Sequence, residues 1–414
     1  MTDNYEALEA CRLCGGTALV QVLDLGRQAL TGVFPKDLSE PVTMGPLQLV
    51  WCRDCTLLQL GHSYNLEEMY GWNYGYRSGL NKSMVSHLQN RARALERMAG
   101  LQPGDVVVDI GSNDGTLLAG YETRDVTRVG IDPTGPKFAQ YYPDDVILVP
   151  EFFSADVFRA QVPGHKAKLV TSIAMFYDLD RPVDFARKVA DILADDGIWH
   201  FEQSYMPSML RSTSYDTVCH EHLEYYSLRV VSRVLQVAGL QVTDVRFNRV
   251  NGGSFAVTAT RQNASSPKTE LVDWFLRQED RMDLGTPTPF RSFERRVFQH
   301  RHDLHDLIGV LRDSGATVYG YGASTKGNVL LQFCAITPDD LTAIAEVNPD
   351  KFGKVTPGTG IPIVSEEEMR SARPDYLLVL PWHFREGIVQ REQEFLQSGG
   401  RLIFPLPEIE IVEE

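Results

Sequence analysis

The densest cluster of titratable and aromatic side chains falls in residues 214–228, SYDTVCHEHLEYYSL. It contains His220 and His222, with Glu221 between them and Glu224 close behind. Histidine titrates in the range useful for proton transfer, and a neighbouring carboxylate can orient it, so this segment predicts a general base. Two other interpretations stay open, a merely structural role and metal ligation. The second is poor because the histidines are two residues apart, unlike the i, i+4 pair of HExxH.

Four of the six cysteines form two CxxC pairs, Cys11 with Cys14 in CRLC and Cys52 with Cys55 in CRDC. Each pair places two thiolates on one turn, and two pairs supply the tetrahedral sulfur set that zinc prefers. Disulfides are the first alternative, and a reducing compartment argues against them. A redox CxxC is the second, and no helical pattern follows either pair. We therefore expect a structural zinc ion, with no open position for chemistry.

These candidate sites need elements that position them. Apolar alternation predicts short strands at 20–26 and 47–51, so the metal-clipped N-terminal lobe should be small and β-rich. An aromatic segment, residues 69–78, follows and is too rich in Gly and Tyr for a helix. It is expected to pack over another domain, either as a simple packing stripe or as a substrate-lining loop.

The next part of the chain carries a strand followed by a glycine-rich turn. A helical pattern at 83–98 ends before the apolar strand 106–110, and GSNDGTLL comes directly after that strand. This order predicts the strand, turn and helix start of a doubly wound α/β sheet. The pattern Asp109-x-Gly111-x-x-x-Gly115 differs from the dinucleotide fingerprint. It resembles the first motif of class I methyltransferases that use S-adenosylmethionine (SAM).

That resemblance implies a set of cofactor contacts. A second strand, 127–132, ends in Asp132, where a carboxylate can accept hydrogen bonds from both ribose hydroxyls. The strand at 168–173 leads into the residues that line the methyl-donor pocket of such enzymes, and the pattern at 192–202 repeats a helix, turn and strand. The expected cofactor-binding residues are Asp109, Gly111, Asn113, Gly115, Asp132, Ala174 and Phe176.

The C-terminal part predicts a second, smaller parallel α/β domain. A polar linker at 262–267 and a helical region interrupted at 285–289 precede the strand 317–321, which meets the turn GASTKGN. Free backbone N–H groups and a lysine at such a helix start can hold phosphate, although the Walker spacing is absent. Further strands are expected at 343–348, 375–380 and 400–405. A second α/β domain indicates either a second ligand or a purely structural role.

Length and charge limit the number of domains and the class of protein. With 414 residues the chain should form two or three domains, and we place them at 1–80, 81–265 and 266–414. The formal net charge of −15 argues against nucleic-acid binding, which needs a basic surface. No run of about 18 apolar residues and no basic leader are visible. We therefore expect a cytoplasmic protein without membrane contact.

Taken in order, the CxxC pairs, VVDIGSNDGTLL, EHLEYYSL and VYGYGASTKGN resemble the deoxysugar C-methyltransferases over nearly the whole chain. That family adds a methyl group at C-3 of nucleotide-linked 4-keto-6-deoxysugars. The resemblance implies that His222 is the base of a Glu221–His222 pair, that Tyr76 is a catalytic aromatic residue, and that the nucleotide diphosphate lies between the middle and C-terminal domains. The implied substrate contacts are Ser324, Thr325, Lys326, Lys351, Trp382 and Glu224.

The resemblance therefore implies an α/β protein of three parts: a zinc lobe, a class I SAM methyltransferase domain and a Rossmann-like sugar-nucleotide domain. SAM and a structural Zn²⁺ are the expected cofactors, and a monomer or small homo-oligomer is expected. SAM-dependent O- or N-methylation of another small molecule is one alternative, against which the second α/β domain argues. The other is a non-catalytic SAM- or sugar-nucleotide-binding protein, which would have little use for the Glu221–His222 pair.

Overall fold

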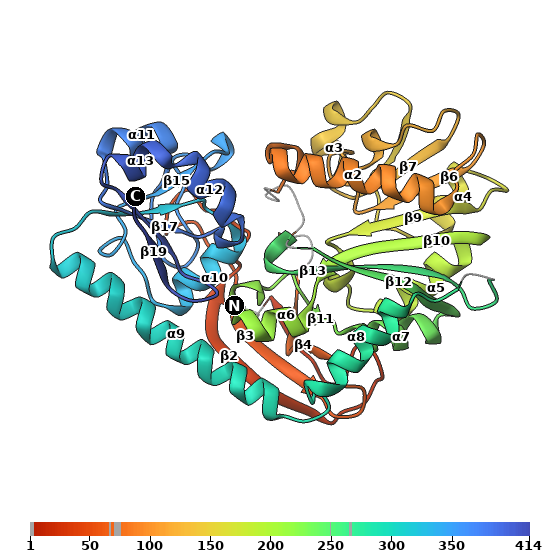
Figure 1. Ribbon diagram of the computed structural model, residues 1–414, viewed down its shortest axis with the longest axis horizontal. Coiled ribbons are helices and arrows are strands. Elements are labelled where there is room, and N and C mark those ends of the chain that lie inside the picture. The colour runs from red at the N-terminus through yellow and green to blue at the C-terminus, as the bar shows by residue number, and fades with distance from the viewer. Residues whose placement is uncertain (1–3, 66–67, 70–75, 249, 265–266) are drawn as a thin grey trace.

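The computed structural model describes residues 4–65, 68–69, 76–248, 250–264 and 267–414. The central aromatic residues of the segment 69–78, residues 70–75, lie outside this range. Figure 1 shows two large lobes side by side, with a smaller set of strands lying against both of them. Each lobe is built on its own β-sheet, which agrees with the α/β architecture predicted from the sequence.

The middle lobe contains a seven-stranded sheet in the order β12-β13-β10-β9-β6-β7-β8. Numbered along the lobe, this is 6-7-5-4-1-2-3, in which only the seventh strand runs antiparallel to its neighbours. The direction of winding reverses between β6 and β9, so the carboxyl ends of these two strands form the switch point where open α/β sheets bind ligands. The strands are β6 Val106–Ile110, β7 Thr127–Ile131, β8 Val146–Val149, β9 Ala167–Ile173, β10 Leu193–Ser204, β12 Leu240–Asn248 and β13 Ser254–Arg261.

Helices cover both faces of this sheet. Helix α2 packs on one face through residues spaced three or four apart, and the opposite face is covered by α4, α5 and α7. The helices of this lobe are α2 Lys82–Ala99, α3 Gly135–Phe138, α4 Ala155–Gln161, α5 Pro182–Ile192, α6 Met206–Ser212 and α7 Leu228–Val237. The side chain of Asn81 caps α2 by accepting from the Ser83 N–H, and Gly100 ends it with φ +61°.

One local expectation was wrong. The sequence predicted a helix start at the glycine-rich turn after β6, but the chain there forms turns and a single 3-10 turn, Leu118–Gly120. A Cβ on Gly120 would lie 2.9 Å from Ala92 Cβ, so α2 packs directly against this turn. Helix α2 occupies the space that a longer helix at this point would need.

The N-terminal lobe has an antiparallel four-stranded sheet in the order β11-β4-β3-β2, and β1 pairs separately with β5. Strand β11, Glu224–Tyr225, comes from the middle of the chain and pairs with β4. The remaining strands are β1 Tyr5–Ala7, β2 Leu19–Ala29, β3 Met44–Cys52, β4 Leu58–Leu60 and β5 His62–Tyr64. The division of the chain at residues 80 and 265 stays a prediction, and this sheet crosses it at β11.

The C-terminal lobe has a six-stranded sheet in the order β16-β15-β14-β17-β18-β19, which is 3-2-1-4-5-6 when numbered along the lobe. This is the Rossmann order, with an antiparallel last strand. Its strands are β14 Val318–Tyr321, β15 Ile344–Glu346, β16 Ile363–Ser365, β17 Tyr376–Val379, β18 Arg401–Phe404 and β19 Glu410–Val412. Its helices are α10 Thr325–Phe333, α11 Glu366–Ala372, α12 Arg385–Arg391 and α13 Gln393–Gln397, and α8 Glu270–Arg281 and α9 Thr288–Asp313 lead into it.

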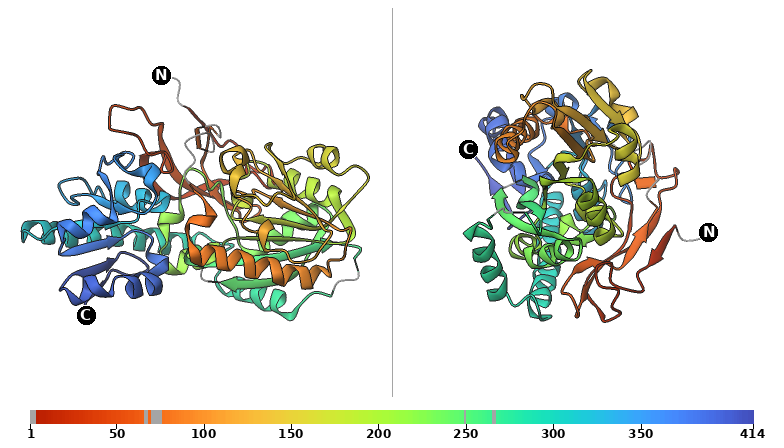
Figure 2. Two further views of the ribbon diagram at one scale, coloured as in Figure 1. Left: turned by 90° about the horizontal axis from the view of Figure 1, so that it is seen from above. Right: turned by 90° about the vertical axis from the view of Figure 1, so that its right-hand side faces the viewer.

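The N-terminal strands join the two larger lobes. Helix α9 runs beneath the C-terminal sheet and contacts β2, and the ring of Trp51 lies 5.7 Å from that of Phe290. On the other side, Cys52 and Cys55 belong to the apolar core of the middle lobe. Figure 2 shows these strands lying along one side of both lobes. Among the described residues, no helix has the length and apolar character that a membrane span requires.

Candidate functional site

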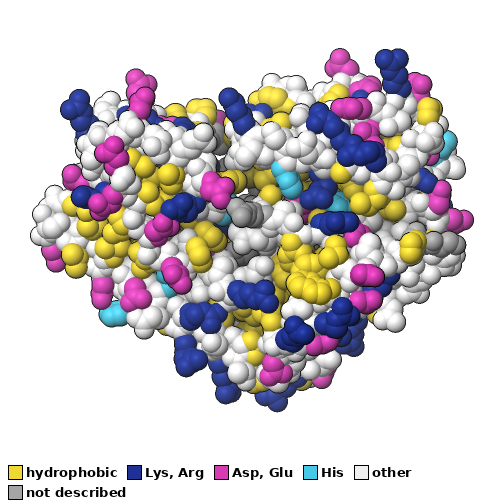
Figure 3. Space-filling model, viewed as in Figure 1, with side chains coloured by type: hydrophobic (Ala, Val, Ile, Leu, Met, Phe, Trp, Pro, Cys, Tyr) yellow, Lys and Arg dark blue, Asp and Glu magenta, His cyan; other side chains and the backbone are white. Residues whose placement is uncertain are grey.

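A cavity of about 1680 Å³ opens between the two large lobes, and Figure 3 shows the surface hollowed there. Residues at or just beyond the carboxyl ends of β6, β7 and β9 line one side, and residues at the ends of β14, β15 and β17 line the other. Gly32 and Phe34 of the N-terminal lobe complete the wall. The cavity therefore lies at the position where both sheets, by their topology, are expected to bind ligands.

On the middle-lobe side, Asp132 is held as an acceptor. Its Oδ2 accepts from the Asn113 N–H at 2.8 Å, and its Oδ1 accepts from the Thr134 N–H at 2.7 Å. Gly111 has φ +76°, and a Cβ there would lie 3.0 Å from Met175. The cavity is lined by Asp132, Gly111 and Asn113. The turn therefore brings a carboxylate, and a stretch of backbone without a side chain, to one wall.

Asp109, also on this wall, ends β6 and is almost fully buried. Its Oδ1 accepts from the Thr171 hydroxyl at 2.6 Å. Burial raises the pKa of Asp109 to about 7, and the Thr171 hydrogen bond opposes that rise. The carboxyl group of Asp109 therefore titrates near neutral pH.

Two predicted cofactor residues lie behind the cavity wall. A Cβ on Gly115 would lie 2.9 Å from the Tyr142 ring, whose hydroxyl donates to the Asn113 carbonyl at 2.8 Å. Gly115 thus allows the turn to close on Tyr142 without reaching the cavity itself. Phe176 is fully buried and stacks on Tyr226 at 5.4 Å. Of the two residues predicted beyond β9, Ala174 lines the cavity, while Phe176 fills the core.

His222 is half-buried and lines the cavity. Its Nδ1 lies 2.8 Å from the carbonyl oxygen of Thr217. A carbonyl oxygen only accepts, so Nδ1 carries the proton and Nε2 keeps its lone pair. Burial, aided by the positive charge of Lys326, lowers the pKa of His222 to about 3. The imidazole is therefore neutral near pH 7.

Glu221 also lines the cavity, but it faces the N-terminal lobe. Its Oε2 accepts from the Thr31 hydroxyl at 3.5 Å, and a Cβ on Gly32 would lie 2.5 Å from Oε1. Burial raises the pKa of Glu221. The ring nitrogen of His222 that a neighbouring carboxylate was expected to orient is instead held by the Thr217 carbonyl.

Tyr76, the third predicted catalytic residue, and His220, the other histidine of the segment, lie in different surroundings. Tyr76 is half-exposed and lines the cavity, and its carbonyl accepts from Asn113 Nδ2 at 3.2 Å. His220 is fully buried, with its ring edge-on to Tyr64 at 4.6 Å. The two histidines separate because the chain turns between them, with the His222 N–H donating to the Cys219 carbonyl at 3.2 Å.

On the C-terminal side, the turn after β14 ends at the start of α10. Ser324 caps this helix by accepting from the Gly327 N–H at 3.0 Å. Ser324, Thr325 and Lys326 all line the cavity. Burial lowers the pKa of Lys326, and the Asp216 carboxylate opposes this shift. This wall therefore presents a helix N-terminus and an ammonium group together.

Lys351, Trp382 and Glu224 were also predicted to contact substrate, and only Lys351 lines the cavity. The Nζ of Lys351 donates to the Ala323 carbonyl at 2.7 Å. Trp382 lies beneath the wall, where its Nε1 donates to Asp216 Oδ2 at 2.8 Å. Glu224 is buried in β11 and is not among the residues that line the cavity.

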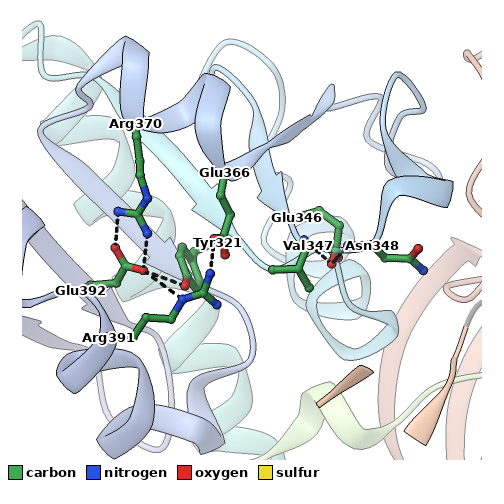
Figure 4. Close-up of polar contacts among 8 residues, drawn as sticks. All are labelled: Tyr321, Glu346, Val347, Asn348, Glu366, Arg370, Arg391 and Glu392. Atoms are coloured by element: carbon green, nitrogen blue, oxygen red, sulfur yellow. Dashed lines mark hydrogen bonds and ion pairs between the residues drawn. The ribbon is translucent and has the colours of Figure 1, made fainter. Parts of the chain in front are cut away.

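Sequence analysis missed Glu346, at the carboxyl end of β15. Its Oε1 accepts from the N–H groups of Val347 and Asn348, at 2.7 and 3.0 Å, and it lines the cavity (Figure 4). Its Oε2 lies 3.5 Å from Lys351 Nζ. Like Asp132, it is an acid that ends the second strand of its sheet and accepts from backbone N–H groups. The signal was in the sequence, 24 residues after Gly322, as Asp132 lies 21 residues after Gly111.

The wall near Glu346 is supported by ion pairs to a buried carboxylate. Glu392 is fully buried and accepts two hydrogen bonds from Arg370, each at 2.8 Å, and one from the Tyr321 hydroxyl at 2.9 Å (Figure 4). Arg391 pairs with both Glu392 and Glu366. This network ties α11 and α12 to β14, so the cavity wall at this end is rigidly backed.

The four paired cysteines come together as predicted. The sulfur atoms of Cys11, Cys14, Cys52 and Cys55 all lie within 4.8 Å of one another. Four sulfurs arranged tetrahedrally at 2.3 Å from zinc lie about 3.8 Å apart. The thiols thus fit a zinc ion and supply all four ligands, which makes the site structural.

Comparison with known proteins agrees with this arrangement. Family models match the chain at residues 11–70 ("Putative zinc binding domain"), 84–245 ("Methyltransferase domain") and 249–407 ("C-methyltransferase C-terminal domain"). The C-methyltransferase NovU of Streptomyces niveus is 32% identical over 416 residues, covering 100% of this chain and 99% of NovU.

Solved structures match less of the chain. The mitomycin 7-O-methyltransferase MmcR is 16% identical with a TM-score of 0.35, covering 44% of this chain and 55% of its own. The CcbJ methyltransferase of Streptomyces caelestis is 14% identical with a TM-score of 0.33, covering 42% of this chain and 95% of its own.

The match to NovU extends over the whole chain, and the four cysteines fall within the zinc-binding match. Both expected cofactors, SAM and Zn²⁺, follow from the matched domains and from the sulfur cluster. The chain belongs to the family of SAM-dependent C-methyltransferases that have a zinc-binding N-terminal domain.

Proposed function

We propose that this enzyme methylates C-3 of a nucleotide-linked 4-keto-6-deoxysugar, with His222 as the general base. The observation that carries the proposal is the placement of His222. Its Nδ1 is held by the Thr217 carbonyl, and its ring faces the cavity that joins the ligand-binding edges of two Rossmann-like sheets.

A hydrogen on C-3 is acidic because the C-4 ketone can accept the electron pair. His222 Nε2 takes this proton, and the electrons of the C–H bond form an enolate whose negative charge lies on the C-4 oxygen. SAM supplies an electrophilic methyl group on a positively charged sulfur, which leaves as a neutral thioether. The enolate carbon C-3 forms the new bond to that methyl group. The protein is therefore asked mainly to align two ligands and to accept one proton.

The state of His222 supports this role. With a pKa lowered to about 3, the imidazole is unprotonated at physiological pH and available to accept a proton. The hydrogen bond to Thr217 keeps the ring in one tautomer and one orientation. Glu221 and Tyr76 line the same cavity, and we place them beside the reacting sugar.

For SAM, we assign the wall formed by Asp109, Gly111, Asn113, Asp132 and Ala174. Asp132 would accept from the ribose hydroxyls, because it lines the cavity directly after the second strand and keeps its carboxylate as an acceptor. Gly115 shapes the turn without contact. Phe176 is left out of this assignment because it is fully buried in the core.

For the nucleotide of the substrate, we assign the opposite wall. The N-terminus of α10, with Ser324, Thr325 and Lys326, would hold the diphosphate. Glu346 would accept from the sugar of the nucleoside, as Asp132 would from the ribose of SAM. The pocket for a single drug-sized ligand has a volume of about 300–1000 Å³. A cavity of about 1680 Å³ has room for two ligands meeting end to end.

The test is turnover with methyl-labelled SAM and a panel of nucleotide-linked 4-keto-6-deoxysugars. The matched control is the same sugar nucleotide with its C-4 ketone reduced to an alcohol, which removes the acidity at C-3 and leaves the nucleotide unchanged. We expect label on C-3 of the keto sugar and none on the alcohol. Label on oxygen or nitrogen, or equal labelling of the reduced sugar, would contradict the proposal.

A further inference from the structure

Arg12 lies inside the first zinc knuckle, between Cys11 and Cys14, and its side chain is only 1% exposed. Its guanidinium joins the N-terminal strands to a segment of the middle lobe. It donates to the carbonyl oxygens of Leu60 (2.7 Å) and His62 (3.3 Å), to Ser63 Oγ (2.8 Å) and to Asp180 Oδ1 (3.2 Å). These contacts hold the Arg12 side chain in the interior of the protein, although arginine is usually found at the surface.

The same guanidinium lies beside a buried carboxylate. Arg12 Nε is 4.0 Å from Glu224 Oε1, and the Glu224 side chain is 0% exposed. Burial raises the pKa of Glu224 well above its usual range, and the charge of Arg12 opposes this shift. A buried carboxyl group is costly unless a cation accompanies it. Arg12 supplies that cation from the zinc knuckle.

Glu224 begins the short strand that follows His222. Strand β11 makes only two residue pairs with β4, and the Leu60 N–H donates to the Leu223 carbonyl at 2.8 Å. Leu223 in turn donates its N–H to the Tyr177 carbonyl at 2.8 Å, and the ring of Tyr177 packs on His222 at 4.3 Å. His222 thus lies two residues before a strand with few hydrogen bonds of its own.

Arg12 contacts three of the segments that meet at this point. It reaches β4 through Leu60, β11 through Glu224, and the segment after Tyr177 through Asp180. The Tyr177 segment packs against one side of His222, and β11 fixes the backbone on the other. Displacing reacting groups by about 1 Å can cost 100-fold in rate, so this junction is well placed to govern turnover.

We propose that Arg12 is a positioning residue for His222: the first zinc knuckle carries it into the junction of β4, β11 and the Tyr177 segment, where it holds the base in place. This role rests on the proposed function of His222. Metal binding would fix the turn from which Arg12 projects. The zinc site would therefore help to position His222 as well as stabilise the N-terminal lobe.

The chain offers a matched control. Arg53 occupies the same position in the second knuckle, directly after Cys52, but it is exposed to solvent. Arg12→Gln removes the buried cation, whereas Arg53→Gln removes an arginine with the same relation to zinc and no buried role. A double variant, Arg12→Gln with Glu224→Gln, removes both members of the ion pair and leaves no unpaired charge.

The variants should be compared by zinc content, SAM affinity, kcat and KM, and by amide hydrogen exchange of the peptide 217–226. We expect Arg12→Gln to keep its zinc and its SAM affinity, to lower kcat by about 10- to 100-fold with KM unchanged, and to speed exchange in that peptide alone. The double variant removes the unpaired charge as a cause, and it should stay impaired in kcat and in exchange because it still lacks the hydrogen bonds that Arg12 donates. Arg53→Gln should match the parent in every measurement.

Wild-type kcat and exchange in Arg12→Gln would overturn the proposal. So would loss of zinc from Arg12→Gln, which would make Arg12 part of the metal knuckle, or a double variant with the parent's kcat and exchange, which would make the unpaired charge of Glu224 the whole cause. The exchange and zinc measurements need no catalysis. If His222 proves not to be the base, faster exchange at 217–226 would still show that Arg12 holds this segment, so the two failures are distinguishable.

Discussion

Replacing Asp132 by Asn should weaken SAM binding and leave nucleotide binding intact. Asp132 now accepts from the Asn113 N–H on one oxygen and from the Thr134 N–H and hydroxyl on the other. Asn presents one oxygen and one NH₂ group, so one of these donors must face another donor. The change removes the negative charge but keeps the shape of the side chain.

The expected size of the effect follows from these contacts. A hydrogen bond from a ribose hydroxyl to a charged acceptor contributes about 1.5–3 kcal/mol. At about 1.4 kcal/mol per tenfold change, the Kd for SAM should rise about 10- to 150-fold. Asn113 and Asp132 both line the cavity, so water can reach the N–H group that loses its acceptor. The cost to folding should therefore be small.

Isothermal titration calorimetry with SAM, with S-adenosylhomocysteine and with a panel of nucleoside diphosphates (dTDP, UDP, CDP, GDP and ADP) measures this directly. The matched variant is Glu346→Gln, which makes the same chemical change at the equivalent strand end of the other sheet. It should weaken the best nucleoside diphosphate by a similar factor and leave SAM binding unchanged. The reasoning is refuted if Asp132→Asn binds SAM as tightly as the parent, or if both variants weaken both ligands equally.

Three further outcomes are expected. His222→Ala should bind both ligands but lose at least about 100-fold in turnover. With S-adenosylhomocysteine in place of SAM, it should also fail to exchange the C-3 hydrogen of the substrate in deuterated water. His220 is buried against Tyr64 and should not serve as the base. Cys52→Ser should lose the zinc, about one per chain, as metal analysis of the purified protein would show, and should destabilise the N-terminal lobe. The folded protein holds the Asp109 proton more tightly, because folding raises the pKa of this group from 3.8 to about 7. The contribution of that proton to the free energy of unfolding is therefore complete below pH 3.8 and is lost as the pH rises through about 7. Asp109→Asn should therefore flatten the pH dependence of stability between these values, measured by denaturant unfolding.

Local patterns predicted the elements well. The glycine-rich turn after an apolar strand, at 106–115 and again at 317–327, indicated two doubly wound sheets, and the structure contains both. The CxxC pairs indicated one cluster of four sulfurs, which the structure brings together. Such features are readable because a strand end, a turn or a metal knuckle is specified by residues close together in the chain.

Side-chain direction was less predictable. Phe176 and Ala174 are two residues apart, yet one fills the core and the other lines the cavity. Trp382 lies beneath the wall while its neighbours Pro381 and His383 face the ligand space. Spacing alone cannot decide these cases, because outside regular helices and strands the turn itself determines which side a residue faces.

The sequence by itself determined which functional groups are present: four thiolates for zinc, acids at strand ends, and a histidine next to a glutamate. Only the tertiary structure decided how these groups are used. It turned Glu221 toward Thr31, assigned the Thr217 carbonyl to His222, and brought Arg12 to Glu224 across more than 200 residues. The physical reason is that burial and long-range pairing set the charge and orientation of a side chain, and neither is written in the residues adjacent to it.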